Sequence, residues 1–240
     1  NVAIHEVVPA TFDDYITLPV VVIPDKEVNL GLTTGGKVTK ITVDKGSRVT
    51  KDMVLLETDT VLLKAQLDNA ESTLEYQKKE FERNQKLFRD NSITEAAFDA
   101  AKLQLDQTKT ACDIAKKQLD DATLKAPFAG VVTVRNVEVG DILGAGTAAF
   151  RLIDMSRVKV QVGIPEKYIE DFRTGNAVSI SFDAIPGQEF DGRIGFVSPE
   201  ADPQVRTFLA EIVINNSKGL LRGGIMGDAR ILRKSIADAV

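Results

Sequence analysis

Residues 61–122 read VLLKAQLDNAESTLEYQKKEFERNQKLFRDNSITEAAFDAAKLQLDQTKTACDIAKKQLDDA, and this stretch decides the fold. It contains neither glycine nor proline, whereas both residues are scattered through the sequence on either side. Glycine and proline are the residues that most often interrupt helices, so a long stretch without them indicates helix. The sequence therefore predicts that most of these 62 residues are helical.

A heptad pattern of apolar, small and a few polar residues occurs twice within this stretch. The spacing alternates between four and three residues along each half. The first seam consists of Leu63, Leu67, Ala70, Leu74, Gln77, Phe81, Asn84 and Phe88. The second seam consists of Phe98, Ala101, Leu105, Thr108, Cys112, Ala115, Leu119 and Ala122. Two consecutive heptad seams predict two helices that pack against each other as a coiled coil.

The residues between the two seams favour a turn. Residues 90–95 read DNSITE, in which Asn91 suits a helix end and either Ser92 or Thr94 can cap the next helix. A turn at this point folds the two helices into an antiparallel hairpin. At 1.5 Å per residue, an arm of roughly 28 residues is about 40 Å long. We therefore expect the hairpin to project from the rest of the chain.

The segments on either side of the hairpin repeat each other. The repeated positions are Gly36, Val38, Val43 and Gly46 in the first half and Gly130, Val132, Val137 and Gly140 in the second. Their identical spacing indicates an internal duplication. Alternating polar and apolar residues with glycines at the turns predict short strands in both halves. We expect the halves, residues 26–60 and 123–155, to form one small β-sandwich, with the hairpin of residues 61–122 inserted between them.

The rest of the chain has the pattern of a second β-domain. Short strands at regular spacing follow from about residue 156, with one short helix whose first turn contains Pro165. This pattern predicts a small β-barrel over residues 156–232, to which residues 11–25 add a strand. The end segments, residues 1–10 and 233–240, are expected to be remnants of a further domain.

The composition excludes several classes of function. The 240 residues carry a net charge of −5, whereas a surface for nucleic acid or an anionic membrane would need a basic excess. The single cysteine, Cys112, cannot form an internal disulfide, and the single histidine, His5, cannot build a histidine metal cluster. No apolar run reaches the roughly 18 to 20 residues that span a bilayer. The opening Asn1-Val2-Ala3 suggests a trimmed or processed piece.

One stretch before the hairpin resembles a lipoyl domain. Residues 55–60, LLETDT, are similar to the family pattern in which a lysine follows Glu-Thr-Asp and carries lipoate or biotin. Here that position is Thr60, which has no amine, and the nearby Lys64 belongs to the predicted helix. Glu57 and Asp59 fit a turn better than acid–base catalysis, because no histidine or paired base accompanies them. The resemblance implies a split lipoyl-like β-sandwich, and a lipoyl or biotinyl carrier domain is the less favoured alternative.

A lipoyl-like sandwich split by a coiled-coil hairpin and followed by a barrel resembles the periplasmic adaptors, or HlyD-like membrane fusion proteins, of bacterial tripartite efflux pumps. The most specific match is Arg83, Leu87 and Thr94, which is similar to the family's hairpin-tip pattern of Arg, three residues, Leu, six residues and Ser. In the family these positions contact a TolC-type outer-membrane channel. A weaker match is residues 221–224, LRGG, where the family usually shows Leu-Arg-Pro-Gly-Met.

The three tip residues also have a purely structural interpretation. Without the surrounding architecture, Arg83 would be a solvated charge, Thr94 a helix cap and Leu87 an apolar neighbour of the seam. With that architecture, the resemblance implies that Arg83, Leu87 and Thr94 bind the outer-membrane channel.

The resemblance implies an elongated, mixed α/β multi-domain protein that is not an enzyme and has no catalytic, cofactor-binding or metal-binding residues. It implies a periplasmic adaptor that links an inner-membrane transporter, of the RND type in preference to the ABC type, to a TolC-type channel for the export of small molecules. Self-association as a hexamer and attachment to the inner membrane through a segment absent from this chain are also implied. Residues 1–10 and 233–240 would then belong to a membrane-proximal domain.

A type I secretion adaptor is the main alternative from the same resemblance. The hairpins of those adaptors are commonly much longer. Arms of about four heptads therefore favour efflux.

Overall fold

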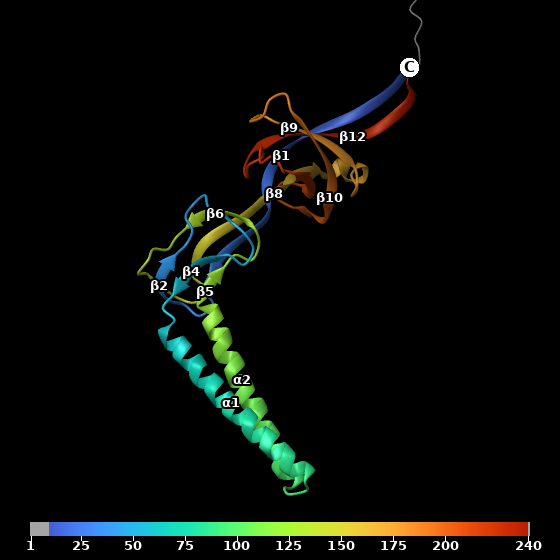
Figure 1. Ribbon diagram of the computed structural model, residues 1–240. Coiled ribbons are helices and arrows are strands. Elements are labelled where there is room, and N and C mark those ends of the chain that lie inside the picture. Colours follow the sequence, from blue (N-terminus) through green and yellow to red (C-terminus); the bar gives the residue numbers. More distant parts are fainter. Residues whose placement is uncertain (1–9, 240) are drawn as a thin grey trace, which may run out of the picture. The chain divides into compact units, whose positions relative to one another are not determined.

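The computed structural model describes residues 10–239 and the side chains of residues 14–233. The chain divides into two compact units, drawn in Figure 1. The described part of the first, which we call the barrel unit, covers residues 10–27 and 153–239. The second, which we call the hairpin unit, covers residues 28–152. The remaining end residues, 1–9 and 240, lie outside the described residues, and with them most of the expected amino-terminal domain remnant.

Two long helices lie side by side in the hairpin unit (Figure 1). Helix α1 spans Val61–Arg89 and helix α2 spans Glu95–Asp121. Asn91 has a φ of 54°, the left-handed conformation that asparagine tolerates better than most residues at a helix end. Thr94, one of the two residues that could cap the second helix, is the N-cap of α2. The predicted helical hairpin and its turn are therefore confirmed.

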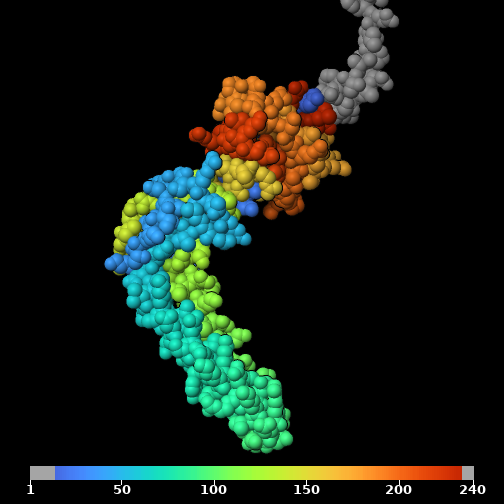
Figure 2. Space-filling model, in the orientation of Figure 1, coloured from blue at the N-terminus to red at the C-terminus, as the bar shows by residue number. Residues whose placement is uncertain are grey.

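The burial of the helices follows the predicted heptad seams. Every predicted seam position in α1 is half-buried, although no residue of this helix is fully buried. In α2 the seam residues Thr108, Cys112 and Ala115 are buried, and the remaining ones of the helix are half-buried. Figure 2 shows the two helices as a solid rod that extends beyond the strands of the same unit. The outer faces of a two-helix rod remain in solvent, which accounts for their charged residues.

The base of the hairpin is closed by Thr58. Its hydroxyl donates a hydrogen bond to the carbonyl oxygen of Ala122 at 2.8 Å, and its backbone N–H donates to the same oxygen at 3.2 Å. Next to this contact, strands β4 (Val54–Thr58) and β5 (Thr123–Lys125) pair antiparallel. The antiparallel hairpin thus returns the chain to the point at which it left the strands.

The strands of the hairpin unit form two sheets. One has the order β5-β4-β2-β7, with β2 at Gly36–Ile41 and β7 at Ile142–Leu143. In the other, β3 (Arg48–Val49) pairs with β6 (Gly130–Arg135), and β6 follows β8 (Ala148–Pro165) in the sheet order. The fully buried side chains between the strands include Leu55, Leu56, Val132, Ala149 and Leu152.

The predicted internal duplication is visible in the hydrogen bonds of this unit. The Gly46 N–H donates to the Val132 oxygen at 2.8 Å, and the Gly140 N–H donates to the Val38 oxygen at 2.9 Å. Gly46 and Gly140 have φ values of 86° and 100°, which favour glycine. Each repeat therefore places its turn against a strand of the other repeat.

Arg135 joins the two repeated turns. Its guanidinium bonds to the carboxylate of Asp44 at 3.1 Å and to that of Glu138 at 2.9 Å. The pKa of Asp44 is lowered, first by the hydrogen bond from the Lys45 backbone N–H and then by the positive charge of Arg135. These turns are exposed, so their ion pairs fix local geometry more than they add stability.

The barrel unit consists of six strands and one 3-10 helix. Its strands follow the order β1-β12-β9-β10-β11-β8, and β1 also pairs with β8, which joins the two ends of this order. The strands not yet given are β1 (Ala10–Gly31), β9 (Ala177–Phe182), β10 (Glu189–Asp202), β11 (Thr207–Asn215) and β12 (Met226–Ala239). The predicted short helix is a 3-10 helix at Glu166–Asp171, and Pro165, which was expected in its first turn, is the residue directly before it.

The core of the barrel unit is made of apolar residues that alternate along its strands. Strand β8 contributes Val158, Val160, Val162 and Ile164, all of which are almost fully buried. Strands β1 and β8 each continue from one unit into the other, because they are long enough to contribute to both. Within the described part of the chain, neither long helix has an apolar stretch sufficient to cross a membrane.

Candidate partner-binding site

The three predicted site residues lie at the end of the hairpin remote from the strands. Arg83 and Leu87 are one helical turn apart near the end of α1, and Thr94 stands directly before α2. Figure 1 shows this end of the hairpin with no strand beside it. The fold therefore brings all three residues to the same tip, although none of them contributes to the strand cores.

Arg83 is an exposed cation on the outside of α1. Its side chain is 68% exposed, and its Nη2 lies 3.0 Å from Oε1 of Glu80, three residues earlier. An ion pair at this spacing on an exposed helix contributes only a few tenths of a kcal/mol, about 0.2–0.5. Breaking the ion pair with Glu80 therefore costs little free energy, and the guanidinium can bind a carboxylate or carbonyl of a partner instead.

Leu87 presents an apolar side chain to solvent beside the turn. It is 38% exposed, although Phe88 next to it lies in the half-buried seam. Its backbone oxygen accepts a hydrogen bond from the Ser92 N–H at 2.7 Å, which closes the turn. The backbone of Leu87 is thus held while its side chain remains available for contact.

Thr94 caps the amino-terminal end of α2 with its hydroxyl. Its Oγ1 accepts a hydrogen bond from the Ala97 N–H at 3.2 Å and caps α2. An accepting hydroxyl still carries its own hydrogen, which can be donated to a partner. Capping and partner contact are therefore compatible at this position.

Three aromatic rings support the tip from inside the hairpin. The rings of Phe88 and Phe98 stack with centroids 4.7 Å apart, and those of Phe81 and Phe98 lie 5.5 Å apart. Aromatic pairs contribute about 0.5–1.5 kcal/mol beyond their buried area. The sequence placed all three residues on the seams and close to the turn, which was a signal for a cluster at the tip. It did not show which rings meet.

The carrier position of lipoyl domains has a different structure here. Thr60 directly precedes α1, and the Asp59 carboxylate accepts a hydrogen bond from the Val61 N–H at 3.1 Å. Lys64 lies on the first turn of α1, where its N–H donates to the Thr60 oxygen at 2.8 Å. The exposed tight turn that presents a carrier lysine is replaced by the start of the helix.

We expect the chain to stay unmodified when it is produced together with lipoyl and biotin ligases. Thr60 has no amine, and the amine of Lys64 is carried on a helix. Intact-mass measurement checks this, with an authentic lipoyl domain from the same cells as the positive control. A lipoyl or biotinyl increment on Lys64 would make the chain a carrier domain.

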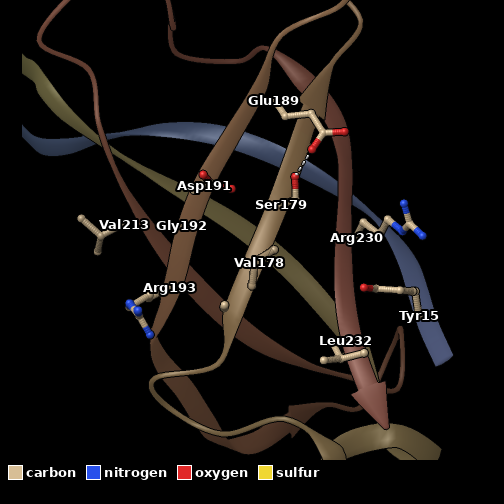
Figure 3. Close-up of a pocket in the computed structure, with 11 residues that line it drawn as sticks. Tyr15, Val178, Ser179, Glu189, Asp191, Gly192, Arg193, Val213, Arg230 and Leu232 are labelled. Carbon is tan, nitrogen blue, oxygen red and sulfur yellow. Dashed lines mark hydrogen bonds between the residues drawn. The ribbon is translucent and has the colours of Figure 1, made fainter. Parts of the chain in front are cut away.

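A groove of about 770 Å³ lies on the barrel unit, lined from β1, β9, β10, β11 and β12 (Figure 3). At one end the Ser179 hydroxyl donates to the Glu189 carboxylate at 2.7 Å. At the other side the Arg230 guanidinium lies 4.1 Å above the ring of Tyr15. Asp191 pairs with Ser179 across the two strands and also lines the groove, and Ser179 and Glu189 form a hydrogen bond at the surface.

Among the described residues, no group of three or more His, Cys, Asp or Glu side chains is arranged to hold a metal ion. Cys112 lies buried in the helix seam, where it packs as a small apolar residue.

Two family models match separate parts of the chain. The model of the α-helical hairpin domain of RND membrane fusion proteins matches residues 59–128. The model of the CusB-like β-barrel domain matches residues 157–235. These two matches cover the hairpin and the barrel that the structure shows, and they define the chain as a protein of the adaptor type.

Individual proteins agree with the family models. The nodulation protein NolF of Rhizobium meliloti is 30% identical over 185 residues, which are 73% of this chain and 50% of that protein. A UPF0194 membrane protein of Acidithiobacillus ferridurans is 39% identical over 103 residues, which are 43% of this chain and 30% of that protein. The chain thus spans half or less of the length of these curated relatives.

A solved structure shows the same fold. The crystal structure of a MacA-MexA chimeric protein that contains the Pseudomonas aeruginosa MexA α-hairpin domain has a TM-score of 0.85 and 20% sequence identity. The match covers 96% of this chain and 85% of that one. This likeness shows the fold, and the two family models assign the chain to the RND-type membrane fusion proteins.

Proposed function

We propose that this chain is the periplasmic adaptor of a tripartite efflux pump and that the hairpin tip binds a TolC-type outer-membrane channel. The observation that carries the proposal is the exposed position of Arg83, Leu87 and Thr94 on a hairpin of the RND membrane fusion type. The two arms of 29 and 27 residues have about the four-heptad length that favours efflux over type I secretion.

The proposed partners follow the division of the chain. An inner-membrane transporter, of the RND type in preference to the ABC type, would face the barrel side, and six copies of the chain would assemble around the export path. The protein would act in the periplasm and be attached to the inner membrane by a segment outside this sequence. Residues 26–60 and 123–155 would form the lipoyl-like domain and residues 11–25 and 156–232 the barrel domain.

The proposed mechanism is structural and not enzymatic. A cation, an apolar side chain and a hydroxyl at the tip can engage a partner helix by a charge-assisted hydrogen bond, by filling a groove and by a short hydrogen bond. The stacked Phe88 and Phe98 rings hold the ends of α1 and α2 together, so that these contacts are made by a preformed surface.

Substitution of the tip tests this proposal in cells. We expect Arg83→Asp or Leu87→Asp to abolish efflux complementation, because each puts a negative charge in the contact surface without touching the helix seam. Leu103→Asp is the matched control, since Leu103 is 59% exposed on α2 away from the tip. Helical circular dichroism and self-association should be unchanged in all three variants. Full efflux by folded Arg83→Asp or Leu87→Asp protein would remove the docking proposal, and loss of folding would show that the residues are structural.

A further inference from the structure

The duplication in the hairpin unit provides an internal comparison between two sheet edges. Gly36 and Gly130 begin the two repeats, so equivalent residues lie 94 positions apart. Ile142 of β7 in the second repeat pairs with Lys37 of β2 in the first, and Arg48 of β3 in the first repeat pairs with Val131 of β6 in the second. Strands β7 and β3 each stand last in their sheet order, so both are edge strands.

The equivalent positions on these two edges carry different side chains. Arg48 and, in the turn before it, Lys45 are exposed, and we call this pair the basic edge. The equivalent residues, Ile142 and Val139, are 83% and 61% exposed, and we call them the apolar edge. Three backbone hydrogen bonds of the first turn have their counterparts in the second, and the exposed side chains at the two pairs of equivalent positions differ.

An exposed apolar edge requires a physical explanation. Proteins commonly protect sheet edges with charged residues, as the basic edge does, because an apolar edge invites association. Ile142 gains nothing from folding if it stays 83% exposed, and Arg48 shows that a charged residue fits the equivalent place. A contact between molecules is the simplest reason to keep both apolar residues uncovered within one chain.

Charge complementarity indicates what covers the apolar edge. Two exposed acidic residues, Glu138 and Asp141, flank Val139 and precede Ile142. The basic edge carries Lys45 and Arg48, and the Arg135 guanidinium binds both the Asp44 carboxylate beside them and the Glu138 carboxylate beside Val139. One edge is therefore apolar with acidic neighbours, and the other is basic with long aliphatic stems that can lie on an apolar surface.

We propose that the basic edge of one copy of this chain packs on the apolar edge of the next copy. Arg48 and Lys45 would approach Asp141 and Glu138, while their aliphatic stems cover Ile142 and Val139. Each copy carries one edge of each kind, so the contact passes from copy to copy and closes into a ring if the rotation allows. This inference rests on the proposed function, which includes self-association of the chain. It adds which two surfaces meet between neighbouring copies.

The repeats also supply the test, because each edge can be converted into the other. We expect Ile142→Arg with Val139→Lys to fold normally, since Arg48 and Lys45 are accommodated at the equivalent positions. Its association constant, measured by sedimentation of the purified chain, should fall about tenfold or more, as for the loss of a central apolar contact. Arg48→Glu should weaken association similarly. Ile114→Arg is the matched control and should leave association unchanged, because Ile114 is 54% exposed on α2. Unchanged association of the edge variants would overturn the proposal.

Disulfide trapping identifies the pairing directly. In a Cys112→Ala background, protein with Arg48→Cys is mixed with protein with Ile142→Cys at the highest concentration that the chain reaches. We expect a mixed disulfide between the two variants. Disulfides only between two Ile142→Cys chains, or none at all, would contradict the proposed contact. Both measurements use the purified chain without a channel, so they succeed or fail independently of docking at the hairpin tip.

Discussion

Leu105→Asp is expected to melt the helical hairpin at a markedly lower temperature. Leu105 lies on the seam of α2, where it is half-buried between the two helices. An aspartate there must either bury an unpaired charge or separate the helices, at a cost of about 2–4 kcal/mol. A loss of this size lowers Tm by roughly 10 °C in a unit of this length. Circular dichroism measures it selectively, because α1 and α2 are the only α-helices among the described residues.

Leu103→Asp separates the effect of burial from that of helix propensity. Leu103 lies two residues away on the same helix but is 59% exposed, so the same chemical change should shift Tm by little. An unchanged Tm for both variants would mean that the seam does not hold the hairpin together. An equally lowered Tm for both would point instead to the cost of aspartate within a helix.

The hairpin was predictable from the sequence because its signals are local. A heptad pattern needs only the chemistry of residues three and four positions apart, and each predicted seam residue is less exposed than its neighbours on the outer faces. The turn was equally local, since Asn91 and Thr94 act on their own backbone. The cross-helix stack of Phe88 on Phe98 depends on where the two helices are placed side by side, and spacing alone does not give that alignment.

The strands were harder to predict where they leave one unit and enter the other. The sequence suggested boundaries near residues 25 and 155, and the second was placed where the pattern changes to regularly spaced strands. In the structure β1 and β8 continue through these points. The hydrogen bonds between strands are made by backbone groups. A few polar side chains therefore change which residues are buried without ending the strand.

The candidate site was predictable in position but not in geometry. A resemblance in three residues pointed to the tip, and the fold places them there. The ion pair of Arg83 with Glu80 and the cap formed by Thr94 come from neighbours within four residues, so they were accessible to sequence reasoning. The offset of 94 residues already makes Arg48 and Ile142 equivalent, but only the strand order shows that both lie on sheet edges.

Asn216→Ala is expected to destabilise the barrel unit more than any surface substitution in it. Asn216 is only 5% exposed, and its amide nitrogen donates to the oxygens of Met155 and Leu221, each at 2.9 Å. Its amide oxygen accepts from the Leu221 N–H at 3.0 Å. Alanine would leave these backbone groups without partners, at about 1–3 kcal/mol for each one that water cannot reach, or roughly 3–5 kcal/mol in all. Leu221, which begins the weak family match at 221–224, is therefore held in the core by this side chain.

Urea unfolding measures the change, and Asn215→Ala is its matched control. Asn215 is the preceding residue, but it is exposed, and its side-chain oxygen accepts a hydrogen bond from the Ser217 N–H at 3.1 Å. We expect its replacement to cost less than about 1 kcal/mol. The chain has no tryptophan, so fluorescence reports its three tyrosines, of which Tyr15 and Tyr168 belong to the barrel unit. A lower unfolding midpoint for the Asn216 variant alone would show that the side-chain clamp stabilises the barrel, whereas equal midpoints for both variants would show that water replaces its hydrogen bonds at little cost.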